Sequence, residues 1–152
     1  MVELHSRSLL YEIWLLSAST QMILDRLGAP TGVSADETAV LATLRFTGGA
    51  SQKQISELTS MRRSTLSMML GRLERAGLAS RTTNPLDARS RIFAITAKGD
   101  QVLDILEESI FRIEGAYGAE AAMKWEDSVS AIRRLREEIL RYGKAEITRA
   151  VP

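Results

Sequence analysis

The chain of 152 residues contains no cysteine. Without thiols it can form no disulfide, no zinc–thiolate site and no thiol-based redox sensor. Its single histidine, His5, lies near the amino terminus, so a Ser-His or Cys-His catalytic pair has no other residue to use. A phosphate-binding glycine-rich motif is also missing, and Gly48-Gly49 is interpreted as a turn between helices. We therefore expect that the protein is not an enzyme and holds no metal or cofactor.

Long hydrophobic runs are missing as well. Polar residues interrupt every apolar stretch, so no membrane span is predicted. The first residues, which include Glu3 and His5, do not resemble a signal peptide. The hydrophobic content of 45% is typical of a folded domain with its own core. We expect residues 1–152 to form a single cytoplasmic domain that has no membrane partner.

The small net charge of +1 hides an uneven distribution. Residues 51–91 hold eight basic and three acidic side chains, a net charge of +5, whereas the rest of the chain has a net charge of −4. A basic segment of this kind indicates a surface that faces a polyanion such as nucleic acid. The alternative is a solvated basic face that has no partner.

Both ends of the chain are predicted to form long helices on their apolar spacing. Residues 4–27 carry Leu9, Ile13, Leu16, Ile23 and Leu27 on one stripe. Residues 97–142, interrupted at 115–119, carry Val102, Leu103, Leu106, Ile110, Ile113, Trp125, Val129, Ile132, Leu135 and Ile139. These stripes are larger than one small domain can cover, so both segments are predicted to be dimerisation helices. The alternative is that they pack only on their own domain.

The central segment, residues 34–96, has the signals of short helices followed by a hairpin. Two capping boxes, Ser34 with Glu37 and Ser51 with Gln54, predict helix starts. Glycines at Gly48-Gly49 and at Gly77 predict helix ends. The side chains expected to be buried in these helices are Val40, Leu41, Leu44, Phe46, Ile55, Leu58, Leu66, Met69, Leu70 and Leu73.

Residues 51–77 have the length of a helix-turn-helix. The segments "LASRTT" (78–83) and "RIFAIT" (91–96) predict two strands, joined by a turn at Asn84-Pro85 and Asp87, and Thr96 is expected to cap the next helix. A hairpin directly after a helix-turn-helix makes a winged helix. The predicted fold class is therefore mainly α: a winged helix-turn-helix core with a two-stranded wing, flanked by long N- and C-terminal dimerisation helices.

The outer face of the helix at 63–76 is small, polar and cationic, which suits a recognition helix in the major groove of double-stranded DNA. The expected DNA contacts on this helix and at its start are Arg62, Arg63, Ser64, Thr65, Ser67, Met68, Arg72 and Arg75. On the wing, Arg89 and Arg91 are expected to reach the adjacent minor groove, with Asp87 holding one of their guanidinium groups. The alternative for each is a solvated surface side chain, and for Asp87 a turn residue.

Together these motifs resemble the MarR family of transcription regulators. The resemblance lies in "SQKQISELTSMRRSTLSMMLGRLERAGLASRTTNPLDARSRIFAITAKG" (51–99), above all in "RLERAGLASR", "DARS" and "ITAKG". It implies a winged-helix homodimer in which the terminal helices form the interface. It also implies a regulator that binds pseudo-palindromic operators and is often released by a small aromatic or phenolic effector. We expect a repressor, with an activator as the alternative.

This chain departs from the family pattern at a few positions. Ala88 stands where the family wing commonly has arginine, and Met68 and Gly71 stand where polar or charged residues are common. These departures affect the expected operator sequence rather than the expectation of DNA binding. Candidate side chains for an effector pocket are Tyr11, Trp14, Met22 and Trp125, with core or dimer interface as the alternative role.

A second function is compatible with the same fold. A winged helix can serve protein–protein contact, for instance in an antagonist that pairs with another regulator. The net charge of +5 in residues 51–91 and the arginines of the wing favour DNA over this alternative.

Overall fold

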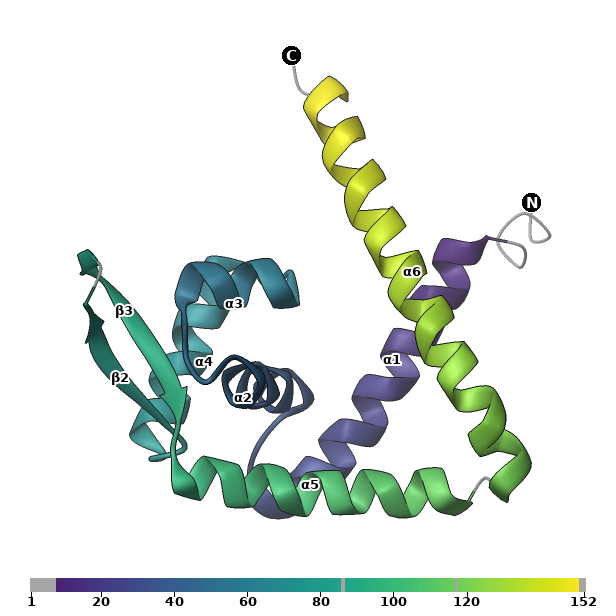
Figure 1. Ribbon diagram of the computed structural model, residues 1–152, viewed down its shortest axis with the longest axis horizontal. Helices are drawn as coiled ribbons and strands as arrows, with labels where there is room; N and C mark the ends of the chain where they lie inside the picture. Colours follow the sequence, from purple (N-terminus) through teal and green to yellow (C-terminus); the bar gives the residue numbers. More distant parts are fainter. Residues whose placement is uncertain (1–7, 86, 117, 151–152) are drawn as a thin grey trace. The chain divides into compact units, whose positions relative to one another are not determined.

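The computed structural model describes residues 8–85, 87–116 and 118–150. Over these residues the protein is mainly helical with one small antiparallel sheet, which confirms the predicted fold class (Figure 1). The elements in chain order are α1 (Leu9–Gly28), the short helix η2 (Ala29–Thr31), α2 (Ala35–Thr47), β1 (Ala50–Ser51), α3 (Gln52–Thr59), α4 (Arg63–Arg75), β2 (Ala79–Asn84), β3 (Asp87–Ile95), α5 (Ala97–Ala116) and α6 (Gly118–Ala150).

The chain divides into two compact units, Met1–Ser109 and Ile110–Pro152. The first unit contains the winged helix, whose core lies between α2, α3, α4 and the sheet. The largest fully buried side chains are Val40, Leu41, Leu44, Ile55, Leu66, Leu70, Leu73, Leu103 and Leu106. Most of the side chains that the sequence places in this core are therefore buried as predicted.

Both predicted capping boxes are present. The Ser34 hydroxyl accepts a hydrogen bond from the Glu37 backbone N–H (3.3 Å), and the Glu37 carboxylate accepts one from the Ser34 backbone N–H (3.0 Å). Ser51 and Gln54 make the same reciprocal pair, at 3.3 and 2.9 Å. Because each box satisfies backbone donors that the first helical turn leaves unpaired, it determines where its helix begins.

The turns of the helix-turn-helix use left-handed backbone. Gly77, after α4, has the positive φ of 72° that its predicted role requires. Ser60 ends α3 with a φ of 61°, a conformation that is uncommon outside glycine. The three residues 60–62 therefore connect α3 to α4.

The wing differs from the predicted two-stranded hairpin. β1 pairs with β3, which pairs with β2, so the sheet has the order β1-β3-β2. β3 begins at Asp87, four residues before its predicted start, and the ladder is irregular between Thr83 and Asn84. β1 has only two residues, which is too short for an alternating pattern to reveal, and its pairing partner is distant in the sequence.

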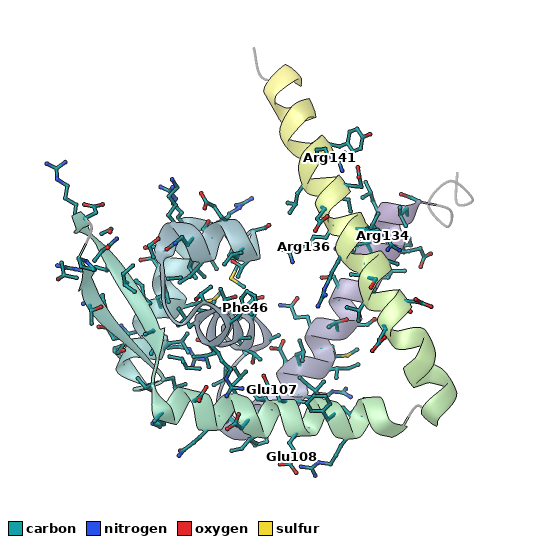
Figure 2. All side chains as sticks on the ribbon, in the orientation of Figure 1. Phe46, Glu107, Glu108, Arg134, Arg136 and Arg141 are labelled. Atoms are coloured by element: carbon teal, nitrogen blue, oxygen red, sulfur yellow. The ribbon has the colours of Figure 1, made fainter. Side chains whose placement is uncertain are left out.

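Two apolar side chains predicted to be buried are exposed instead. Phe46 on α2, which is labelled in Figure 2, is exposed. Its exposed fraction is 88%, and that of Leu58 on α3 is 44%. On α2 the buried face consists of Val40, Leu41 and Leu44, and Phe46 lies on another side of the helix. Apolar identity alone did not reveal which face of each helix meets the core.

The terminal helices were predicted at about the right places. α1 begins at Leu9, and the predicted start at residue 4 lies outside the described residues. α6 continues to Ala150, beyond the predicted end near 142. The side chain of Trp125 also lies outside what the structure describes. Among the described residues, no helix is both long and apolar enough to cross a membrane.

The start of α5 is bonded to the end of α4. The Thr96 hydroxyl accepts from the Gly99 backbone N–H (3.1 Å), as predicted for a cap, and donates to the Gly77 carbonyl (2.6 Å). Lys98 Nζ donates to the Ala76 carbonyl (2.9 Å). Gly99 lies against the backbone of Leu78, so the first turn of α5 and the end of α4 are in close contact.

Gly99→Ala is expected to destabilise the protein. The added Cβ would lie 2.1 Å from the Leu78 carbonyl oxygen, so the backbone must move, at a cost of about 1–3 kcal/mol. Gly71→Ala in α4 is the matched control, because its Cβ would meet only the end of the Arg75 side chain, at 3.9 Å. That variant should gain about 0.5–1 kcal/mol from helix propensity. Urea denaturation followed by circular dichroism measures both, and equal stability of the two variants would contradict the close contact.

Candidate nucleic-acid interface

The helix α4 has one buried and one exposed face, as predicted. Leu66, Leu70 and Leu73 are buried in the core. On the other side, Ser64, Ser67 and Arg75 are exposed and Met68 is 71% exposed. The predicted contact Thr65 lies on the flank and is half-buried. Small and polar side chains on the exposed face leave room for a nucleic-acid groove to approach the helix closely.

The first turn of α4 presents positive charge and free backbone donors. Arg62 and Arg63 are both exposed, and Arg62, at the cap position, makes no side-chain cap hydrogen bond. The amide groups of this turn therefore point outward at the positive end of the helix dipole. Gln52 Nε2 donates to the Arg63 carbonyl (2.8 Å), which holds the start of α3 beside the start of α4.

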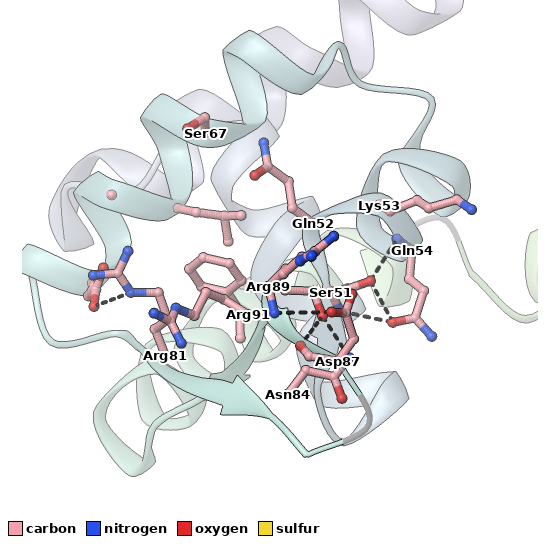
Figure 3. A pocket seen from close by; sticks show the side chains of 15 residues that line it. Ser51, Gln52, Lys53, Gln54, Ser67, Arg81, Asn84, Asp87, Arg89 and Arg91 are labelled. Atoms are coloured by element: carbon pink, nitrogen blue, oxygen red, sulfur yellow. Dashed lines mark hydrogen bonds and ion pairs between the residues drawn. The ribbon is translucent and has the colours of Figure 1, made fainter.

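A groove of about 580 Å³ lies between α4, the start of α3 and the wing (Figure 3). It brings together the predicted contacts Ser67, Asp87, Arg89 and Arg91, which are up to 24 positions apart in the sequence. Its other lining residues are Ser51, Gln52, Lys53, Gln54, Leu70, Gly71, Glu74, Arg81, Asn84, Ser90 and Phe93. The other predicted contacts on α4 and at its start do not line this groove.

The wing tip is stabilised by hydrogen bonds between residues that are close in the sequence. Asp87 Oδ1 accepts from the backbone N–H of Arg89 (3.0 Å), and Asn84 Nδ2 donates to the Ser90 hydroxyl (2.8 Å). The Arg91 guanidinium donates to the Thr83 hydroxyl across the hairpin. Asp87 therefore holds the backbone of Arg89 and not a guanidinium group, because a short carboxylate reaches the amide two residues later in a turn.

The guanidinium groups near the groove differ in their partners. Arg81 Nε lies 3.3 Å from Glu74 Oε1, so this positive charge is partly neutralised. Arg89 has no ion pair with any of the residues that the structure describes, and its side chain is exposed. An arginine without a protein partner on a hairpin tip is available to neutralise a phosphate or enter a narrow groove.

Arg72, a predicted DNA contact, forms an ion pair with a carboxylate of the protein, although its side chain is half exposed. Its Nε and Nη2 atoms pair with the carboxylate of Glu37, and Nη2 also donates to the Gly32 carbonyl (3.1 Å). Glu37 is only 3% exposed, and its carboxylate also accepts from the Ser34 hydroxyl (3.1 Å). This ion pair attaches α4 to the start of α2 and to the turn before it.

Sequence reasoning missed the contribution of α3 to the groove. Gln52 and Lys53 line it from the first turn of α3, and Arg81 lines it from β2. The capping box at Ser51 was a signal for the helix start, and Lys53 was part of the basic segment. Neither signal indicated that the start of α3 would lie across from the wing, since that proximity depends on tertiary packing.

Comparison with known proteins gives both a family match and structural neighbours. Residues 31–90 match the model of the MarR family. The wild-type MarR of E. coli in its apo form has a TM-score of 0.69 at 19% identity, over 82% of this chain and 96% of that chain. A mutant MarR of E. coli complexed with operator DNA has a TM-score of 0.65 at 18% identity, over 79% and 89%. The YusO protein of Bacillus subtilis has a TM-score of 0.59 at 25% identity, over 84% and 95%.

No curated protein sequence matches the chain. The helices α3 and α4, joined by a short turn and followed by the wing, define a winged helix-turn-helix protein. The resemblance to the MarR family is confirmed, because the family model matches residues 31–90, most of the winged helix, and the chain has the fold of solved MarR proteins.

Glu37→Gln is expected to lower the free energy of unfolding by about 1–2 kcal/mol. The amide oxygen can still complete the capping box with Ser34, but the amide nitrogen cannot accept from Arg72, so the variant removes the charge and one hydrogen bond of that pair. Glu74→Gln is the matched control, because both side chains of its pair with Arg81 are partly exposed (34% and 50%), and the pair should contribute less than about 1 kcal/mol. Urea denaturation compares the two variants. An equal loss of free energy of unfolding in both variants would show that burial of Glu37 does not strengthen its ion pair.

Proposed function

We propose that the protein is a transcriptional repressor that binds double-stranded DNA as a homodimer through α4 and the wing. The observation that carries this proposal is the groove in which Arg89 and Arg91 of the wing face Ser67 of α4 and Lys53 of α3. A solved relative of the same fold was crystallised with operator DNA, and an S. aureus MepR mutant was bound to an oligodeoxyribonucleotide. DNA supplies the polyanion that the basic segment requires.

The proposed DNA contacts follow from where each residue lies on α4 or on the wing. Ser64, Ser67, Met68 and Arg75 on the exposed face of α4 contact base edges and backbone in the major groove. Arg62 and Arg63, with the free amides of the first turn, contact phosphates. On the wing, Arg89 reaches the minor groove, with Arg91 beside it. Arg72 and Thr65 stay predicted contacts at the flank, although the ion pair with Glu37 directs Arg72 to the protein.

The homodimer is supported by the surface of α1. Eight large apolar side chains of this helix are exposed in the single chain: Leu9, Leu10, Tyr11, Trp14, Leu15, Leu16, Met22 and Ile23. They occur on several sides of the helix, and an uncovered apolar surface of this extent marks an interaction site. A second copy of the chain supplies an equivalent apolar helix, and α6 also exposes Ile132, Ile139 and Tyr142.

Release by a small aromatic effector follows from the family resemblance. Tyr11 and Trp14, two of the candidate pocket residues, stack with their ring centroids 6.1 Å apart. Such a pair offers an aromatic surface to a planar ligand, and the same pair suits a dimer interface equally well. The cytoplasm is the expected location for a regulator of this kind.

The functional test is footprinting on duplexes selected from a random library, combined with sedimentation. We expect a particle of about twice 16.8 kDa that protects two half-sites related by a pseudo-two-fold axis. Two recognition helices in successive major grooves place the half-sites roughly one helical turn, about 34–36 Å, apart. A monomer, or equal affinity for every duplex, would contradict this function. Absence of any DNA binding would favour the protein–protein module instead.

Asp87→Ala and Asp87→Asn are expected to differ in DNA binding. Alanine removes the acceptor for the Arg89 backbone N–H, whereas asparagine keeps that acceptor and removes only the charge. Charge alone predicts that both variants bind more tightly than wild type. We expect Asp87→Asn to bind at least as tightly and Asp87→Ala to bind more weakly, because the wing tip loses its conformation.

Arg89→Ala provides the companion measurement by titration at several salt concentrations. It should weaken binding and make the salt dependence shallower, by a slope of about one per protomer if the guanidinium neutralises one phosphate. If Asp87→Ala binds more tightly while it remains folded, Asp87 is only an unfavourable charge at the interface. An unchanged salt slope in Arg89→Ala would place that side chain away from the DNA.

A further inference from the structure

Arg45 binds three carboxylates of one neighbouring helix. It lies in the last turn of α2, and its side chain is 27% exposed. Its Nε donates to Asp100 (2.6 Å), Nη1 to Glu107 (3.0 Å), and Nη2 to Asp104 (2.7 Å) and to the Asp100 carbonyl (2.7 Å). All three guanidinium nitrogens are therefore bound to α5.

The acceptors are spread along α5 rather than gathered at one point. Asp100, Asp104 and Glu107 are spaced by four and three residues, so they lie on one face of the helix. From the first to the last the helix rises about 10 Å, at about 1.5 Å per residue. A single planar cation bound across two turns restrains the direction of the helix axis as well as its distance from α2.

The first turn of α5 has a second attachment. Thr96 and Lys98 bond to the carbonyls of Gly77 and Ala76, which directly follow the recognition helix α4. The helix is therefore bonded at its start to the end of α4, and along its first three turns to the end of α2. α5 continues without a break to Ala116, beyond the end of the first unit at Ser109.

We propose that Arg45 is a positioning residue that determines the separation of the two recognition helices in the homodimer. This inference rests on the proposed function, because only a dimer that binds two half-sites has such a separation. Arg45 contacts no DNA in this proposal. It holds α5 at a defined angle to α2, so that each α4 meets its half-site at one spacing and one rotation.

A purely stabilising role would have a different consequence. A weaker attachment of α5 would then lower the stability of the protein and leave its preference for one operator spacing unchanged. The proposed role predicts the opposite pattern, in which the spacing preference broadens while a single half-site is still recognised. Adding one base pair moves a half-site by about 3.4 Å and rotates it by about 36°, which makes spacing a sensitive measurement.

The experiment measures affinity for a set of duplexes that carry the selected half-sites with the spacer lengthened or shortened one base pair at a time. The variants are Arg45→Gln and the double variant Asp100→Asn with Asp104→Asn. The first lowers the net charge and the second raises it, so long-range attraction to DNA shifts their overall affinities in opposite directions. Loss of the attachment broadens the spacing preference in both.

Glu108→Gln is the matched control. Glu108 lies on α5 but is not among the acceptors of Arg45, and Figure 2 shows Glu107 and Glu108 on opposite sides of the helix. We expect wild type and this control to lose about tenfold in affinity for a one-base-pair change, as for a mismatched site. The Arg45 and aspartate variants should lose about threefold or less, mainly because the original spacing is bound less tightly.

A wild-type spacing preference in folded Arg45→Gln would overturn the inference. If wild type itself shows no spacing preference, the proposed two-site function fails instead, so the two failures are distinguishable. Should Arg45→Gln not fold, Arg45→Lys keeps the charge but binds at one point, and Glu107→Gln removes only one acceptor. A broadened preference in these two variants supports the inference, and an unchanged one rejects it.

Discussion

The burial of one face of α4 fixes the orientation of the surface proposed to bind DNA. Leu66, Leu70 and Leu73 must leave water, and each is buried against the core of the winged helix. Because an α-helix is rigid, burying these side chains turns Ser67 and Met68 outward without any further interaction. The surface proposed to bind DNA is thus a consequence of the hydrophobic core behind it.

The arginines of the winged helix fall into two groups, those that pair with a carboxylate of the protein and those that do not. Arg45 and Arg72 bind carboxylates within the protein and thereby attach helices to one another. Arg62, Arg63, Arg75 and Arg89 form no ion pair with any residue in the described part of the chain. A guanidinium that already has a carboxylate partner gains little from a phosphate unless that pair breaks. The net charge of the segment therefore overstates the charge that is available to DNA.

The attachments of α5 connect this surface to the rest of the chain. The helix starts at the end of α4, is bonded to α2 through Arg45, and continues into the unit that contains α6. On the other side of the winged helix, Asp25 near the end of α1 accepts from the Ala35 backbone N–H at the start of α2 (2.7 Å). α1 and α5 are thus both joined to the winged helix by polar contacts of defined geometry.

Local signals in the sequence were enough to predict most of the helices and where they begin or end. Capping boxes at Ser34 and Ser51 and the glycine at Gly77 act within a few residues, so their effect is readable without knowledge of the fold. The buried stripe of α4 was readable for the same reason, because its spacing matches the helical repeat.

Which of the remaining side chains are buried, exposed or paired depends on how the elements pack together. Phe46 and Leu58 are apolar but exposed, and β1 exists only because β3 lies beside it. Arg72 differs from Arg89 in having Glu37 within reach, 35 positions away in the sequence. These outcomes depend on distances between segments that are far apart along the chain, and local patterns of polarity and charge carry no information about such distances.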